Sequence, residues 1–264
     1  MTRASPPVRL LLAAWFLAPL LGLVLWALTD TWAAGSALPD AWGLQGWGTA
    51  WASGGPQAML RSLALSCAVA VVATPLGAMA ARGLVQASPR TRGWAAALLV
   101  SPVILPPLAV VLGLDVLLLR LQMPSSLGVL GILVVQALPY TTYVMYATYQ
   151  AYDDRYELEA RTLGASTATV LRRVHIPLVA PGLAAALFLS LLVGWSDYVV
   201  TLVVGGGRLV TLPVLVAANA AGTGNEPVVA ALSLSAIVPP LVLLTLAALV
   251  GRRARHSPAA LAAT

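Results

Sequence analysis

The chain has 264 residues, of which 59% are hydrophobic and only 9% are charged, and its mean hydropathy is +0.88. Soluble domains carry about 25% charged residues, so this composition excludes a water-soluble globular protein and indicates an integral membrane protein. The net charge of +6 comes from fifteen arginines and no lysine. Because these arginines follow the pattern of membrane loops described below, we expect no nucleic-acid partner.

Six apolar runs approach or exceed the roughly 20 residues that a membrane helix needs. They are residues 10–28, 58–81, 94–119, 127–149, 178–200 and 228–250. The predicted fold is therefore all-α, a polytopic membrane protein with six transmembrane helices. We divide the chain into a first helix with a Trp-rich extracytoplasmic loop (1–57), a helical core (58–250) that contains a charged loop (151–177), and a tail (251–264).

The arginines predict the orientation of these helices. Twelve of the fifteen fall on one side: Arg3, Arg9, Arg82, Arg90, Arg92, Arg155, Arg161, Arg172, Arg173, Arg252, Arg253 and Arg255. Cytoplasmic loops collect arginine, so both termini and the charged loop should face the cytoplasm. The first run could instead be a cleaved signal peptide, but it is longer than the usual apolar region of one, and we expect it to be retained.

The loop after the first run carries Trp32, Trp42, Trp47 and Trp51. Tryptophan favours the headgroup zone of a membrane, so this loop either lies on the membrane surface or forms a docking surface for an external partner.

The third run is rich in proline, with Pro102, Pro106 and Pro107 in the stretch SPVILPP. Each proline removes a helix hydrogen bond, which suggests a region that moves or lines a path. The sequence contains no nucleotide-binding loop, no paired cysteine and no hydrolase or metalloprotease motif. His175 and His256 lie in basic segments with no second ligand nearby, so we expect neither a catalytic site nor a metal site.

The sequence of the charged loop predicts two short helices joined by a glycine. The first runs from about Asp154 to Leu163, with acidic residues near its positive N-terminal pole, and Gly164 ends it. Ser166 or Thr167 caps the second helix. Arg172 and Arg173 lie in the last turns of this second helix, and Pro177 stops it. An alternative is an ordinary helix–turn–helix that lies on the membrane with its arginines on anionic lipid.

This loop resembles the EAA loop of permease subunits from ATP-binding-cassette importers, whose pattern is E-A-A, three residues, then G. The matching letters are Glu159-Ala160, Leu163-Gly164-Ala165-Ser166 and His175-Ile176-Pro177-Leu178, followed by Pro181-Gly182. Glu159 precedes Gly164 by five residues rather than six, and Arg161 replaces the second alanine. Counting back from Gly164 gives Leu158, flanked by Glu157 and Glu159, so either glutamate could serve the motif.

Two further stretches are similar to this family. Residues 61–82 resemble the opening of the transport core, and SPVILPP resembles the branch that moves polyamines, ferric iron, sulfate and molybdate. The resemblance implies a type I permease subunit in the plasma (inner) membrane of a prokaryote. It implies two ATPase subunits that bind ATP and Mg²⁺, a second permease subunit (the same or a paralogue), and an extracytoplasmic solute-binding protein. It also implies that the loop couples to the ATPase through Glu157, Glu159, Ala160, Gly164, Arg172, Arg173 and Pro177.

Polar residues inside the apolar runs are candidates for the translocation path, because charges are costly in a membrane. Asp197 either lines the path or sits at a solvated helix end, and Asp115 is expected to pair with Arg120 or Arg61. Gln136, Tyr140, Tyr143 and Gln150 share one predicted helix face, which serves either the path or helix packing. A polyamine-like cation is the preferred solute. The alternatives are ferric iron, an oxyanion, thiamine or an aminophosphonate, or a secondary transporter driven by an ion gradient.

Overall fold

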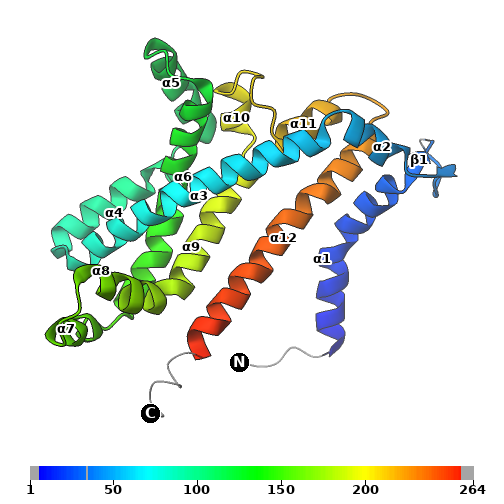
Figure 1. Ribbon diagram of the computed structural model, residues 1–264. Helices are drawn as coiled ribbons and strands as arrows, with labels where there is room; N and C mark the ends of the chain where they lie inside the picture. The colour runs from blue at the N-terminus through cyan, green and yellow to red at the C-terminus, as the bar shows by residue number, and fades with distance from the viewer. Residues whose placement is uncertain (1–5, 34, 257–264) are drawn as a thin grey trace. The chain divides into compact units, whose positions relative to one another are not determined.

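The computed structural model describes residues 6–33 and 35–256, and this part of the chain is almost entirely helical (Figure 1). The predicted all-α membrane fold is confirmed. Arg3 and the tail from residue 257 onward lie outside the described residues. The chain forms two compact units, residues 1–61 with 211–239 and residues 62–210 with 240–264. Two long helices, α3 (Gly55–Gln86) and α12 (Glu226–His256), contribute to both units.

The first unit contains α1 (Pro6–Ala27), the antiparallel strands β1 (Thr29–Thr31) and β2 (Ala41–Trp42), α2 (Gln45–Ala52) and α11 (Leu212–Ala220). The strands and α2 occupy the predicted Trp-rich loop. The indole of Trp47 donates to the Ala27 carbonyl at 2.9 Å, and the Trp32 ring lies 4.7 Å from that of Trp26. Trp42 and Trp51 are exposed. Two of the four tryptophans, Trp32 and Trp47, therefore make contacts within the fold, and the other two lie on the surface.

The second unit is built around α6 (Ser125–Gln150), which packs along α9 (Ile176–Ser196) (Figure 1). It also contains α4 (Pro89–Ile104), α5 (Pro107–Arg120) and α10 (Val199–Val203). Its main apolar core is made of aliphatic side chains that include Val69, Val111, Leu133 and Val200. Small residues allow the close helix contacts: a Cβ atom at Gly182 would collide with Thr148, and one at Gly77 would collide with Thr141. Membrane helices commonly pack through such positions.

The count of six spans is not confirmed. Within the described part of the chain, four helical segments are long and apolar enough to cross a membrane: Gly55–Gln86, Ser125–Gln150, Thr167–Ser196 and Glu226–Leu246. The N-terminal helix α1 is 22 residues long, and its fully described part contains the apolar segment Leu17–Ala27.

The third predicted span, 94–119, is not one straight helix. It is divided into Pro89–Pro102 and Pro107–Arg120, which are bent by 89° relative to each other. Leu105 and Pro106, between α4 and α5, have extended backbone, with ψ of 145° and 120°. A proline disfavours helical conformation in the residue before it, and two successive prolines extend this effect over both positions. The pair counts as a fifth span only if it crosses as a broken helix.

Candidate functional site

The charged loop forms two short helices joined by a glycine, as the sequence predicts. The first is α7 (Arg155–Thr162), and the second is α8 (Thr167–Val170). Gly164 has a φ of +84°, a conformation that glycine adopts without strain. The Gly164 amide donates to the Arg161 carbonyl, and the Ala165 amide donates to the Ala160 carbonyl, both at 3.0 Å. This pair of bonds is a Schellman motif, so Gly164 and Ala160 together fix the end of α7.

The second helix does not stop at Pro177, which corrects the prediction. The Ser166 side chain caps α8 by accepting from the Thr169 amide. The chain then passes through a π-helical turn, η1 (Leu171–His175), directly into α9, whose first turn holds Pro177. Proline is tolerated in the first turn of a helix, and π turns release a helix from the regular hydrogen-bond register. The short helix α8, the turn η1 and α9 are therefore one continuous helical rod.

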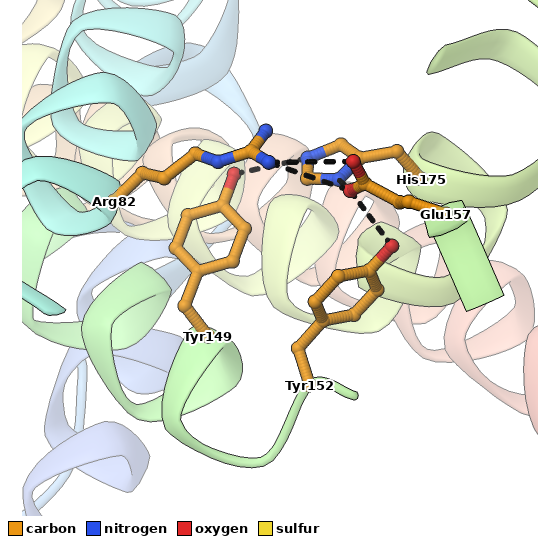
Figure 2. A network of polar contacts seen from close by, with 5 residues as sticks. All are labelled: Arg82, Tyr149, Tyr152, Glu157 and His175. Carbon is orange, nitrogen blue, oxygen red and sulfur yellow. Dashed lines mark hydrogen bonds and ion pairs between the residues drawn. The ribbon is translucent and has the colours of Figure 1, made fainter. Parts of the chain in front are cut away.

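Glu157 lies at the centre of a polar network that joins four parts of the chain (Figure 2). Its carboxylate is 2.8 Å from Nδ1 of His175 in η1 and accepts from the Tyr152 hydroxyl at 2.9 Å. The guanidinium of Arg82 in α3 lies 3.4 Å from the same carboxylate. Nε2 of His175 is 3.3 Å from the hydroxyl of Tyr149 at the end of α6. The network thus ties α7 to α3, α6 and η1.

The network favours the charged form of Glu157. Burial alone raises the pKa of this carboxyl, but the hydrogen bonds from His175 and Tyr152 and the charge of Arg82 outweigh burial and lower the pKa below its ordinary value. An ionised carboxylate only accepts hydrogen bonds, so Nδ1 of His175 is the donor. Burial, and then the bond to Glu157, raise the pKa of Tyr152, which keeps its hydroxyl protonated as a donor.

Most of the other predicted loop residues are exposed, whereas Ala160 is partly buried. Glu159, Arg172 and Arg173 are exposed, and so is Leu158, which stands at the position counted back from Gly164. Glu157 is the buried residue of α7. The structure therefore separates the two candidate glutamates, because Glu157 is held internally and Glu159 faces outward.

Sequence reasoning missed four members of this network: Arg82, Tyr149, Tyr152 and His175. His175 was expected to have no second ligand nearby, but the structure places Glu157 against its Nδ1. Arg82 is 75 residues from Glu157 in the sequence, so no local pattern connects them. The available signal was weaker: Tyr149, Tyr152 and His175 are polar or aromatic residues at the two ends of the charged loop.

Three of the predicted path residues, Asp197, Gln136 and Tyr140, line one cavity of about 380 Å³ in the second unit. Pro102 and Pro107, on either side of the break between α4 and α5, line it too. The cavity is therefore built from α6, the α9–α10 junction and the proline-rich break in SPVILPP.

Asp197 also has a structural role. Its carboxylate accepts from the amides of Val200 and Thr201 and from the Thr201 hydroxyl, at 2.7–3.2 Å. These bonds satisfy the free amides at the start of α10. Asp197 therefore stands at the end of α9 and at the start of α10 while it also lines the cavity.

Tyr143 does not share the cavity of Gln136 and Tyr140. It is 76% exposed and borders a separate cavity of about 250 Å³ with Tyr146 and Arg92. The guanidinium of Arg92 donates to the carbonyls of Leu84, Val85 and Ala87 at the end of α3. The predicted polar stripe on α6 is thus divided between two cavities. Among the described residues, Asp115 forms neither of the expected ion pairs.

Several helices that are long and apolar enough to cross a membrane, a cavity lined by Asp197 and a charged helical loop are typical of a membrane transport protein. Residues 73–256 match the family described as binding-protein-dependent transport system inner membrane component. The chain belongs to this family and is a permease of the ATP-binding-cassette importer type; as a transport subunit it is not by itself an enzyme.

Named relatives agree with this assignment. The spermidine/putrescine transport system permease protein PotC of Haemophilus influenzae is 29% identical over 76% of this chain and 78% of its own length. PotC of Escherichia coli K12 is 29% identical over 74% of each chain. The inner membrane ABC transporter permease protein YnjC of Escherichia coli K12 is 32% identical over 57% of this chain and 30% of its own.

A solved structure has the same fold. A chain in the crystal structure of an amino acid ABC transporter with histidines aligns with a TM-score of 0.55 at 18% identity. The alignment covers 78% of this chain and 97% of that one.

Proposed function

We propose that this chain is the permease subunit of an ATP-driven importer for polyamine-like cations. It would act with a second permease subunit, two ATPase subunits that bind ATP and Mg²⁺, and an extracytoplasmic solute-binding protein. Family membership supports this assembly and argues against the ion-gradient alternative. The names of the relatives from Haemophilus influenzae and Escherichia coli, both spermidine/putrescine permeases, support the solute class.

In α7 a charged side chain is buried and apolar side chains are exposed, and this reversal of the usual pattern supports an ATPase partner. A helix on the surface of a protein normally turns its apolar side inward. In α7 the buried residue is the charged Glu157, whereas Tyr156 and Leu158 are 55% and 62% exposed and Leu163, which caps the helix, is 89% exposed. Tyr156 and Leu158 are two residues apart, so they lie on the two flanks of the outer side of α7, and the exposed Glu159 lies between them. We assign this outer side of α7, flanked by Tyr156 and Leu158 and ended by Leu163, as the docking face for the ATPase.

The continuous rod of α8, η1 and α9 suggests how motion would spread. When the ATPase pair closes around ATP, the docking face would move with it. Because no flexible link separates α8 from α9, α9 would move as well, and α9 leads to the cavity at Asp197. ATP binding shifts the transporter between inward-open and outward-open states only through its unequal affinity for the two states.

The chemistry of the cavity at Asp197 is the observation that supports a cationic solute. Asp197 is the charged residue among its lining side chains, which also include Gln136, Tyr140 and Tyr198. A carboxylate has about four acceptor positions, and three bonds from α10 occupy part of this capacity. Tyrosine rings attract cations through their faces. An ammonium group therefore suits this cavity better than an oxyanion does.

The test is ATP-dependent uptake by the chain reconstituted with a cognate ATPase and solute-binding protein. We expect uptake of spermidine or putrescine, and Asp197→Asn should reduce it about tenfold, as the loss of a charge-assisted contact predicts. Asp115→Asn is the matched control, because Asp115 lies on α5 and does not line this cavity. Unchanged uptake in Asp197→Asn, or uptake of sulfate in place of polyamine, would contradict the proposal.

A further inference from the structure

The carboxylate of Glu157 points away from the docking face. Three side chains bond to it: Arg82, Tyr152 and His175. Only 11% of its side chain is exposed, compared with 43% for Arg82. A residue in this position cannot present its charge to a separate protein unless the network first comes apart.

The partners of Glu157 come from different membrane helices. Arg82 lies four residues before the end of α3, and Tyr152 lies two residues beyond the end of α6. His175 is the last residue of η1 and precedes α9. The network therefore gathers the ends of α3 and α6 and the beginning of α9 around one carboxylate (Figure 2).

The backbone alone attaches α7 loosely. On one side it is joined to α6 by the short segment 151–154, and on the other it is joined to α8 through Gly164–Ser166. Gly164, with its positive φ, is a position about which a helix can swing. Without side-chain contacts, a push on the docking face could turn α7 about this position and leave the membrane helices in place.

We propose that Glu157 is a positioning residue that locks α7 to α3, α6 and α9, so that a displacement of the docking face reaches the three helices together. It is not itself a contact to the ATPase. This inference rests on the proposed function, since it requires an ATPase to bind the docking face. Hydrogen bonds to an ionised group are about twice as strong as neutral ones, which suits a lock that must transmit force.

The experiment compares Glu157→Gln with Glu226→Gln, a matched substitution at an exposed position in α12, outside the charged loop. Three quantities are measured in the reconstituted importer: the amount of ATPase that co-purifies, the rate of ATP hydrolysis, and the solute taken up per ATP hydrolysed. We expect Glu157→Gln to bind ATPase normally and to hydrolyse ATP, but to take up about tenfold less solute per ATP. Glu226→Gln should match the wild type in the last quantity.

A second variant covers the case in which Glu157→Gln does not fold. Tyr152→Phe removes one hydrogen bond from the network and keeps the aromatic ring, and it should lower uptake per ATP in the same direction by a smaller factor. A covalent rescue tests the lock directly. In a Cys67→Ser background, joining Arg82→Cys to Glu157→Cys with a short bifunctional maleimide should restore uptake per ATP.

The outcomes are distinguishable. Normal uptake per ATP in Glu157→Gln, or no gain from the covalent link, overturns the lock. Loss of ATPase binding in Glu157→Gln overturns it as well, since Glu157 would then be a docking residue. If the wild-type chain binds no ATPase, the proposed function fails, and the inference fails with it.

Discussion

Glu157 shows how a charged residue becomes the buried residue of a surface helix. An isolated buried carboxylate is costly, but the cost falls when hydrogen bonds and an opposite charge accompany it. His175 and Tyr152 supply donors at 2.8 and 2.9 Å, and Arg82 supplies the charge at 3.4 Å. Removing any one of these partners leaves the carboxylate less compensated, so the residues should behave as a coupled set rather than as independent contacts.

The lowered pKa of Glu157 predicts how stability depends on pH. Because the pKa in the folded state lies below that in the unfolded state, the stabilisation is complete above the unfolded value of about 4.3 and is lost as the pH falls through the lowered folded value. Thermal unfolding of detergent-solubilised protein is the measurement. The difference between wild type and Glu157→Gln should stay constant from about pH 7 to about pH 5 and shrink below about pH 4. A difference that grows on acidification would contradict this assignment.

The loop helices were predictable at the residue scale, and the network was not. Gly164 and Ser166 act through neighbours within five residues, so the letters alone indicate a helix end and a new cap. The choice between Glu157 and Glu159 depends instead on Arg82 and His175, which are 75 and 18 residues away from Glu157. Only the packing of distant helices decides which glutamate is buried.

At the scale of elements, the π turn η1 explains why Pro177 does not end the second loop helix. The proline lacks an amide hydrogen, so a regular helix through it would leave a carbonyl without its partner. In η1 the register is already shifted, and the Ile176 amide donates to the Leu171 carbonyl. The same turn brings His175 to Glu157. The turn is therefore the element that connects the loop to the network and to α9.

Deleting Arg172 tests the geometry of η1. Removal of one residue should convert the π turn into a regular helix and rotate α8 by about 100° relative to α9, which turns the buried Val170 out of its contacts. We expect ATP-dependent uptake to be lost. Arg172→Ala is the control, because it removes the exposed side chain and keeps the turn. Equal damage from both variants would show that the arginine side chain, rather than the turn, carries the effect.

At the scale of the whole molecule, the lengths of the apolar runs predicted where the long helices lie. The prolines at 106 and 107 broke one of these runs into two helices and so changed the number of straight spans. Runs at 58–81, 127–149 and 228–250 became long helices because nothing in them outweighs helix formation. The run at 94–119 is equally apolar, but Leu105 and Pro106 are extended and the axis turns by 89°. Hydropathy reports how favourable it is to transfer a segment from water into a membrane. It does not predict in which direction the chain continues after a break in a helix. The span count is therefore the part of the fold that composition predicts least well.

The position of the bent pair decides the topology of the entire chain. If α4 and α5 form one broken span, Arg90 and Ser126 lie on opposite sides of the membrane. A re-entrant pair would place them on the same side. It would also move Arg155, Arg161, Arg172 and Arg173 to the outside, against the tendency of arginine to collect in the cytoplasm. The charge pattern thus favours a broken span.

Labelling with a membrane-impermeant maleimide tests this, using Arg90→Cys and Ser126→Cys separately in a Cys67→Ser background. Both positions are exposed, so access to the reagent depends on the side of the membrane. Arg90→Cys should react in inverted vesicles and Ser126→Cys in intact spheroplasts. Reaction of both from one side would establish a re-entrant pair. The docking face on α7 could then lie in the cytoplasm only if the first helices ran in the opposite direction, with the N-terminus outside.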